Sequence, residues 1–155
     1  MRVLAVPPCL LLVAAATLHS QAAPAAKPTV LHWGPAPAVF PKGAKMAVVS
    51  GDPAKAAPFT VELAMPSGYK IAPHFHPIDE TVTVKKGTFF VGMGDVFDAS
   101  KAKPMKTGAT GSMPANAHHF AAVKGATVIA VSAMGPFGMT YVNPADDPQK
   151  QAAKP

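Results

Sequence analysis

The sequence of 155 residues contains very little cysteine, and its single thiol is Cys9. Cys9 lies within an N-terminal segment that we expect to be cleaved, so the mature chain would contain none. Disulfide bonds, a thiol nucleophile and thiolate metal sites are therefore excluded for the mature protein. About 130 residues would remain, which is enough for one domain with its own hydrophobic core and too few for two.

Long hydrophobic runs are also missing, apart from one near the N-terminus. Residues 10–16 read LLLVAAA after the positive charge of Arg2, and residues 20–22 read SQA, with small residues at the two positions that a signal peptidase reads. The run is shorter than the roughly 20 residues of a membrane helix. We therefore expect residues 1–22 to be a signal peptide and the mature protein to be periplasmic or secreted, with no membrane span after cleavage.

Charged residues make up only 14% of the chain, and the positive ones do not cluster. The formal net charge is +6 at pH 7, but the lysines are scattered and only Lys85 and Lys86 are adjacent. A nucleic-acid interface needs basic residues gathered on one face. We therefore expect a solvated basic surface and no nucleic-acid partner.

Helical periodicity is almost absent, and short apolar runs between glycine and proline turns take its place. Residues 59–65 alternate apolar and polar side chains, which predicts a half-buried strand with Glu62 facing solvent. Residues 127–133 are apolar at both parities, which predicts a strand buried on both faces. Residues 88–93 are expected to return as a hairpin about residues 85–87. About eight such strands predict an all-β barrel.

The composition divides the chain into four expected segments. A flexible leader and arm at residues 23–45 follow the signal peptide, a barrel occupies residues 46–144, and a polar tail ends the chain at residues 145–155. The arm carries the only tryptophan, Trp33. Because of its amphipathic bulk, we expect Trp33 to pack the arm onto the barrel or onto a neighbouring subunit.

The most informative stretch is residues 68–87, GYKIAPHFHPIDETVTVKKG. In an extended strand His74, His76 and Glu80 have the same parity and point to one face, together with the valines that follow. Two imidazoles and a carboxylate aimed into an apolar interior are costly to desolvate unless a cation compensates them. The stretch therefore predicts a buried divalent metal site.

These residues resemble the first signature of the cupin superfamily: glycine, five residues, His-x-His, three residues, Glu, six residues, glycine. Residues 108–119, GATGSMPANAHH, resemble the second signature, which supplies a third histidine. Asn116 stands where the family usually has glycine, and asparagine is the residue other than glycine that best tolerates a left-handed backbone. Alignment with the second signature selects His119 as the ligand. In an extended strand His119 also shares a face with the apolar Ala121 and Val123. Because Phe120 then faces outward, His118 stays open as the alternative.

The resemblance implies a small antiparallel β-barrel or jelly roll that holds one divalent first-row transition metal (Fe, Mn, Ni, Cu, Co or Zn). The implied ligands are His74, His76, Glu80 and His119, a donor set that does not choose among these metals. It further implies a small organic ligand or substrate, and the leading expectation is a dioxygenase-like oxidoreductase.

Two other functions stay open, because the sequence offers no convincing second acid or base and Asp79 has the wrong parity. One is a non-catalytic cupin that binds a small ligand or a metal, and the other is a metal-assisted isomerase or lyase. A homodimer is also open, since cupins commonly pair.

Overall fold

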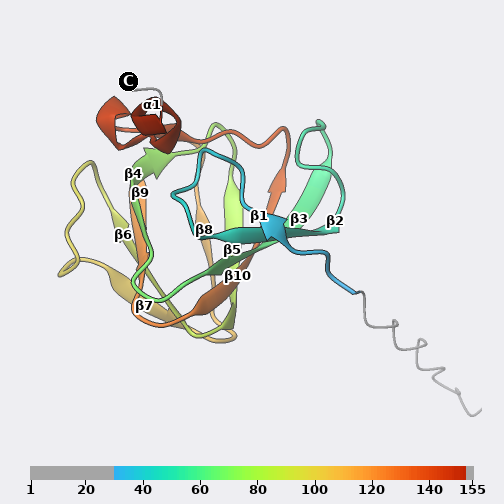
Figure 1. Ribbon diagram of the computed structural model, residues 1–155, viewed down its shortest axis with the longest axis horizontal. Coiled ribbons are helices and arrows are strands. Elements are labelled where there is room, and N and C mark those ends of the chain that lie inside the picture. Colours follow the sequence, from blue (N-terminus) through green and yellow to red (C-terminus); the bar gives the residue numbers. More distant parts are fainter. Residues whose placement is uncertain (1–29, 153–155) are drawn as a thin grey trace, which may run out of the picture.

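In the computed structural model, which describes residues 30–152, the chain forms two antiparallel β-sheets that enclose one core (Figure 1). The six-stranded sheet consists, in spatial order, of β1 (Gly34–Pro35), β2 (Lys45–Ser50), β3 (Pro58–Met65), β10 (Thr127–Met134), β5 (Glu80–Lys86) and β8 (Thr110–Met113). The five-stranded sheet consists of β11 (Thr140–Tyr141), β4 (Lys70–Phe75), β9 (His119–Val123), β6 (Thr88–Met93) and β7 (Lys103–Lys106). A 3-10 turn, η1 (Pro144–Asp146), and a short helix, α1 (Pro148–Ala152), follow the last strand. The predicted all-β architecture is confirmed.

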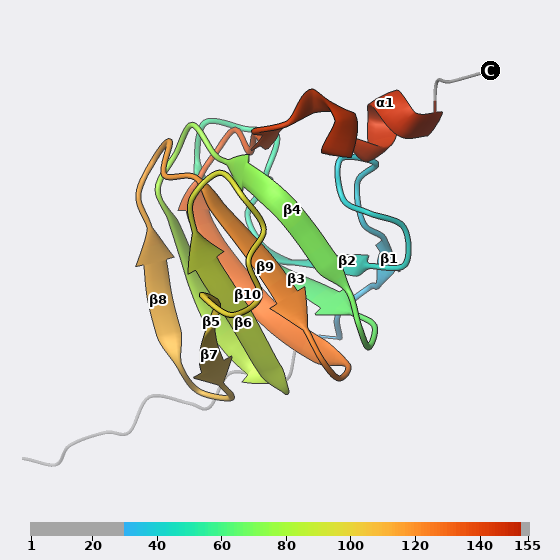
Figure 2. The ribbon, with the colours of Figure 1, turned by 90° about the vertical axis from the view of Figure 1, so that its left-hand side faces the viewer.

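The two sheets face each other across the core, with the five-stranded sheet in front in Figure 2. Side chains alternate between the core and the outside because a strand has a period of two residues. On β3 the core face carries Phe59, Val61, Leu63 and Met65, and Glu62 lies on the opposite face as expected. On the outer face, hydroxyl groups pair between strands, as in the 2.9 Å contact of the Thr60 Oγ1 and Ser132 Oγ.

The predicted strand that runs from the histidines through Glu80 is wrong in one respect. His74 lies on β4 in the five-stranded sheet, whereas Glu80 begins β5 in the six-stranded sheet. The chain therefore crosses between the sheets after His76. The histidines and Glu80 therefore do not lie on one face of a single strand as expected. The Glu80 side chain enters the core from the opposite sheet.

The predicted hairpin of β5 with β6 is also wrong. β5 pairs with β10 and β8, whereas β6 pairs with β9 and β7 in the other sheet. The chain changes sheets at Gly87, where φ is +84°. A Cβ there would lie 2.6 Å from the Thr127 Oγ1 and 2.8 Å from the Ala126 carbonyl oxygen, so the crossing needs glycine both for its backbone angle and for its space.

The prediction that residues 127–133 are buried on both faces is wrong as well. In β10 the residues Thr127, Ile129 and Val131 face the core, whereas Val128 is half-buried and Ser132 is exposed on the other face. β10 is central in its sheet, but its outer face is only partly buried, since Val128 and Ala130 are half-buried and Ser132 is exposed. On this strand, small and apolar residues therefore occupy both the buried and the more exposed face, so their pattern does not predict which face is buried.

The described part of the arm before β2 contributes to the core. Phe40 is buried and stacks on Phe137, with ring centroids 6.1 Å apart. The Tyr69 hydroxyl donates to the Pro41 carbonyl at 2.6 Å, and the Tyr141 hydroxyl donates to the Val39 carbonyl at 2.8 Å. Trp33 keeps 40% of its surface exposed. The arm is therefore attached to the barrel through these carbonyls and Phe40.

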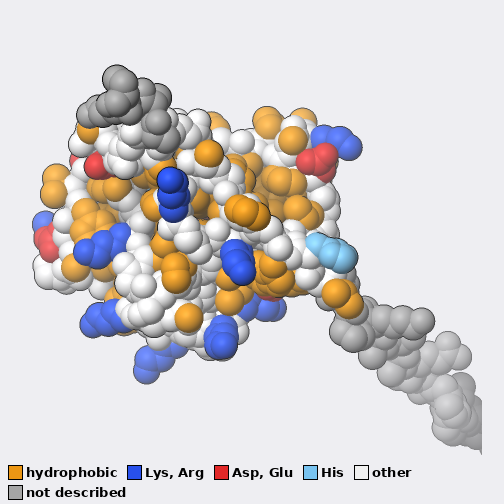
Figure 3. Space-filling view, in the orientation of Figure 1, with side chains coloured by type: hydrophobic (Ala, Val, Ile, Leu, Met, Phe, Trp, Pro, Cys, Tyr) orange, Lys and Arg blue, Asp and Glu red, His pale blue; other side chains and the backbone are white. Residues whose placement is uncertain are grey.

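Three expectations concern the surface and the ends of the chain. The basic side chains visible in Figure 3 are spread singly over that face. No helix between residues 30 and 152 is both long and apolar enough to cross a bilayer. The expected signal peptide at residues 1–22 and the leader that follows it lie outside the described residues.

Candidate metal centre

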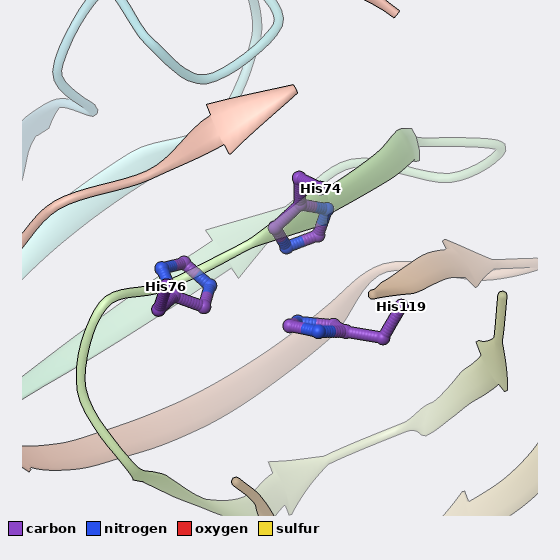
Figure 4. A group of neighbouring side chains, drawn as sticks. All are labelled: His74, His76 and His119. Carbon is purple, nitrogen blue, oxygen red and sulfur yellow. The ribbon is translucent and has the colours of Figure 1, made fainter. Parts of the chain in front are cut away.

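Three histidines from two neighbouring strands meet in the core between the sheets (Figure 4). His74 lies at the end of β4, His76 follows that strand, and His119 begins β9 directly opposite His74 in the register of the two strands. One nitrogen from each ring lies within 4.8 Å of the others. All three residues are 4% exposed or less. The sequence predicted this convergence from the two signatures.

Each imidazole is held by a backbone carbonyl. The Nδ1 of His74 is 2.7 Å from the Ala72 oxygen, that of His76 is 2.6 Å from the Gly138 oxygen, and that of His119 is 2.9 Å from the Ala117 oxygen. A carbonyl can only accept, so each Nδ1 carries the proton and donates it. In the neutral rings every Nε2 is therefore left as a free acceptor, which is the arrangement that metal-binding histidines use.

Glu80 faces these rings from the six-stranded sheet. Its side chain is buried, with Oε1 3.3 Å from the His119 Nε2 and Oε2 3.6 Å from the His76 Nε2. With the Nδ1 protons committed to carbonyls, the group consists of acceptors alone. Acceptors this close in a low-dielectric interior repel one another unless a cation lies among them. Imidazole nitrogen and carboxylate oxygen suit a divalent first-row transition metal, so these residues fit such an ion.

The environment also keeps His74 and His76 in the form that binds a metal. Burial lowers the pKa of His74 to about 3, and electrostatic repulsion between its charged form and the neighbouring imidazole of His119 acts in the same direction. Burial also lowers the pKa of His76, and the opposing attraction of Glu80 does not cancel the effect. Both imidazoles are therefore neutral at ordinary pH, and a neutral ring is required for coordination.

His118, the alternative to His119, lies outside this group. Its Nδ1 is 2.6 Å from the Asp95 Oδ1, its ring stacks on Phe75, and its side chain is 37% exposed. The outward position of Phe120, which had blurred the choice, has a structural cause. Phe97 covers the Phe120 ring from the outside, with centroids 4.9 Å apart, so Phe120 is buried without belonging to the inner face.

The loop before β9 is held by hydrogen bonds to His76 and Asp79, which belong to the segment where the chain crosses between the sheets. The Asp79 Oδ1 accepts from the Ala115 backbone N–H at 2.7 Å, and the Asn116 N–H donates to the His76 carbonyl at 2.7 Å. Asn116 has a φ of +60°, so the left-handed turn expected there is confirmed. Asp79 is exposed and its carboxylate binds this loop, which explains its wrong parity for the core.

The centre opens into a cavity of about 80 Å³. Aliphatic and aromatic side chains form its walls, and Phe137 lies beside His76 with ring centroids 5.2 Å apart. Sequence reasoning missed Phe137 and Gly138. Gly138 acts through its carbonyl oxygen, for which a sequence carries no signal. Tyr69 and Tyr141 are buried, but their hydroxyl groups donate hydrogen bonds to carbonyls of the arm.

Comparison with known proteins identifies the fold. No family model matches the sequence, and no curated protein does. Solved structures match: a cupin superfamily protein from Desulfitobacterium hafniense has a TM-score of 0.50 at 11% identity, covering 59% of this chain and 77% of its own. The chain has the cupin fold. A protein from Methylibium petroleiphilum, proposed to be an acetylacetone dioxygenase, has a TM-score of 0.58 at 22% identity and covers 85% of this chain and 90% of its own.

A further cupin-fold match is a mutant of the salicylate 1,2-dioxygenase of Pseudoaminobacter salicylatoxidans, solved in complex with gentisate. Its TM-score is 0.54 at 12% identity, covering 67% of this chain and 30% of the larger enzyme. Identities this low establish the fold, whereas function is argued from the site itself. In this cupin-fold protein the site consists of three histidines, one glutamate and an apolar cavity.

Proposed function

We propose that this protein is an exported metal-dependent cupin that binds a small organic molecule and acts on it as a dioxygenase-like oxidoreductase. The observation that carries the proposal is the set of three inward Nε2 atoms and one carboxylate at the end of an apolar cavity. Two fold neighbours described as dioxygenases add support for the reaction class. Export is part of the proposal and rests on the expected signal peptide.

His74, His76, His119 and Glu80 would hold the metal. When bound, such an ion supplies Lewis acidity and, if it is redox-active, a route to dioxygen chemistry. Its identity among Fe, Mn, Ni, Cu, Co and Zn is open, because this donor set suits them all.

The residues of the chain contribute orientation and exclusion of water. The carbonyls of Ala72, Ala117 and Gly138 hold the three rings, and the apolar walls keep bulk water from the reacting end of the cavity. Glu80 is the only carboxylate that lines the cavity among the described residues. Because the three Nε2 atoms would be occupied by the metal, a proton that the chain itself removes from a substrate must go to a Glu80 oxygen.

A non-catalytic cupin is the second candidate, and one observation favours it. Apart from the four residues that would hold the metal, the described cavity lining offers no acid or base for proton transfer. Such a protein would retain a small ligand or a metal in its compartment. A metal-assisted isomerase or lyase would need the same missing group.

Oxygen uptake separates these functions. We expect iron- or manganese-loaded protein to consume dioxygen with at least one member of a panel of small phenols, diketones and acids, and zinc-loaded protein to consume none. Tight ligand binding without consumption by either redox-active form would favour the non-catalytic function. Product formation without dioxygen would favour the isomerase or lyase.

A further inference from the structure

The polar groups of the cavity are confined to one of its ends. On the six-stranded sheet, Glu80 lies at the start of β5. Core-facing residues that are paired across β3, β10 and β5 form rows, and the rows that follow Glu80 along β5 are aliphatic. These rows contain Val61, Val131 and Val82, and then Leu63 and Ile129. Core-facing residues two apart on a strand are separated by about 7 Å. The apolar wall therefore extends at least one full row away from the carboxylate.

The core face of the five-stranded sheet also has its polar side chains at one end and aliphatic side chains beyond them. His74 and His119 are paired at the end of β4, and the next core-facing pair is Ile71 with Ala121. Both members of that pair line the cavity. The histidine end of one sheet therefore faces the glutamate end of the other, and aliphatic rows face each other beyond them.

No other hydrogen-bonding or charged side chain lines the cavity within the part of the chain that the structure describes. Its remaining lining residues are proline, alanine, methionine, phenylalanine and branched aliphatic residues. A polar group on the far end of a ligand would lose its water without gaining a partner. For a charged group this should weaken binding by about 100-fold or more relative to an alkyl group of equal size.

The size of the cavity limits the ligand further. A water molecule needs about 10 to 15 Å³ of cavity volume. The cavity volume of about 80 Å³ therefore corresponds to about five to eight waters. Bonded carbon atoms pack more closely than waters do. A ligand that fills the space therefore has about a dozen non-hydrogen atoms or fewer.

We propose that the cavity selects small organic molecules with one oxygen-bearing end and a hydrocarbon body, and rejects molecules with a charge at the other end. This inference rests on the proposed function, because the oxygen-bearing end is assigned to the metal centre. It excludes sugars, amino acids, phosphates and dicarboxylates as ligands. The substrate class follows from the one-ended distribution of polar side chains.

The test compares 4-isopropylcatechol with 3,4-dihydroxybenzoate by calorimetry. The two probes share the catechol end and have the same number of non-hydrogen atoms, but one carries an alkyl group and the other a carboxylate. We expect the alkyl probe to bind the zinc-loaded protein about 100-fold more tightly. Equal affinities, tighter binding of the carboxylate, or no binding of either probe would overturn the proposal.

Zinc keeps this test separate from the proposed oxidoreductase activity. Zinc does not undergo redox chemistry, so the affinities do not depend on turnover. The same pair is measured on metal-free protein, where the alkyl preference should persist because the walls create it. If zinc does not bind but the preference persists, the metal function fails and the ligand class stands. If zinc binds and the preference is missing in both forms, the ligand class fails alone.

Two valine-to-threonine variants place the selectivity on the wall. Val61→Thr adds a hydroxyl group to the cavity at nearly constant shape, and we expect it to weaken binding of 4-isopropylcatechol by about 10-fold without changing zinc content. Val128→Thr makes the same change on the outer face of β10 and should bind like the wild type. Equal affinities of the two variants would contradict the assignment. If Val61→Thr does not fold, the comparison of probes on the wild type still decides.

Discussion

Acidifying the metal-free protein should destabilise it, and His74 should account for a large part of the loss. Burial is the main cause that lowers the pKa of folded His74 to about 3, whereas an unfolded imidazole titrates near 6.5. Between these values the unfolded chain binds a proton that the folded chain does not. The free energy of unfolding is therefore highest above about pH 6.5 and falls progressively as the pH approaches about 3.

The expected size follows from the same difference. One proton of differential binding changes the free energy of unfolding by about 1.4 kcal/mol per pH unit. Lowering the pH from about 7.5 to about 4.5 crosses about two units of the window, so His74 alone should remove about 3 kcal/mol. His76, whose pKa is also lowered by burial, acts in the same direction.

The assay is urea unfolding of chelator-treated protein across this pH range. The comparison variant is His74→Asn, whose side-chain amide can place an N–H donor at the position of Nδ1, facing the Ala72 carbonyl, but does not titrate. The wild type should lose more stability on acidification than the variant does, by about 2 to 3 kcal/mol over the range. The same pH dependence in both proteins would refute the reasoning, because carboxylates that titrate below about pH 5 contribute equally to each.

Substitutions at Gly92, Asn116 and Tyr69 test the scaffold of the site, each by urea unfolding. Gly92→Ala should destabilise by about 1 to 3 kcal/mol, because its Cβ would lie 2.2 Å from the Phe120 Cζ, whereas Gly125→Ala meets nothing within 4 Å and should be nearly neutral; equal effects would count against this packing. Asn116→Gly should be tolerated and Asn116→Ala should cost about 1 kcal/mol, because φ is +60°; a stable alanine variant would argue against the left-handed turn. Tyr69→Phe should cost about 1 kcal/mol and speed proteolysis of the arm, since it removes the bond to the Pro41 carbonyl, and unchanged cleavage would show that other contacts hold the arm.

The centre could be predicted from the sequence because its residues are chemically distinctive. Histidines two residues apart and a glutamate near valines are costly in a core, so their pattern carries information that the rest of the barrel lacks. The parity argument failed between His76 and Glu80 for a physical reason. Parity holds only within one strand, and the chain changes sheets there. The residues converge because two sheets face each other, whatever their parity.

What the sequence could not predict depends on partners that are distant in the chain. The alternation of Thr127 to Ala133 is hidden by small and apolar residues on the outer face of β10. Phe120 is buried by Phe97, which comes from a loop whose own sequence is polar. The carbonyls that orient the rings have no side-chain signature, so Gly138 could not be selected beforehand.

Metal content is the most direct test of the account. Elemental analysis of the mature protein from its native compartment should find about one transition-metal ion per chain. The His76→Ala variant should lose that ion because His76 supplies one of the three converging nitrogens. The His118→Ala variant, altered at an exposed imidazole next to His119, should keep it. A wild type without metal, a His76→Ala variant that retains it, or its loss from the folded His118→Ala variant would contradict a metal centre at these residues.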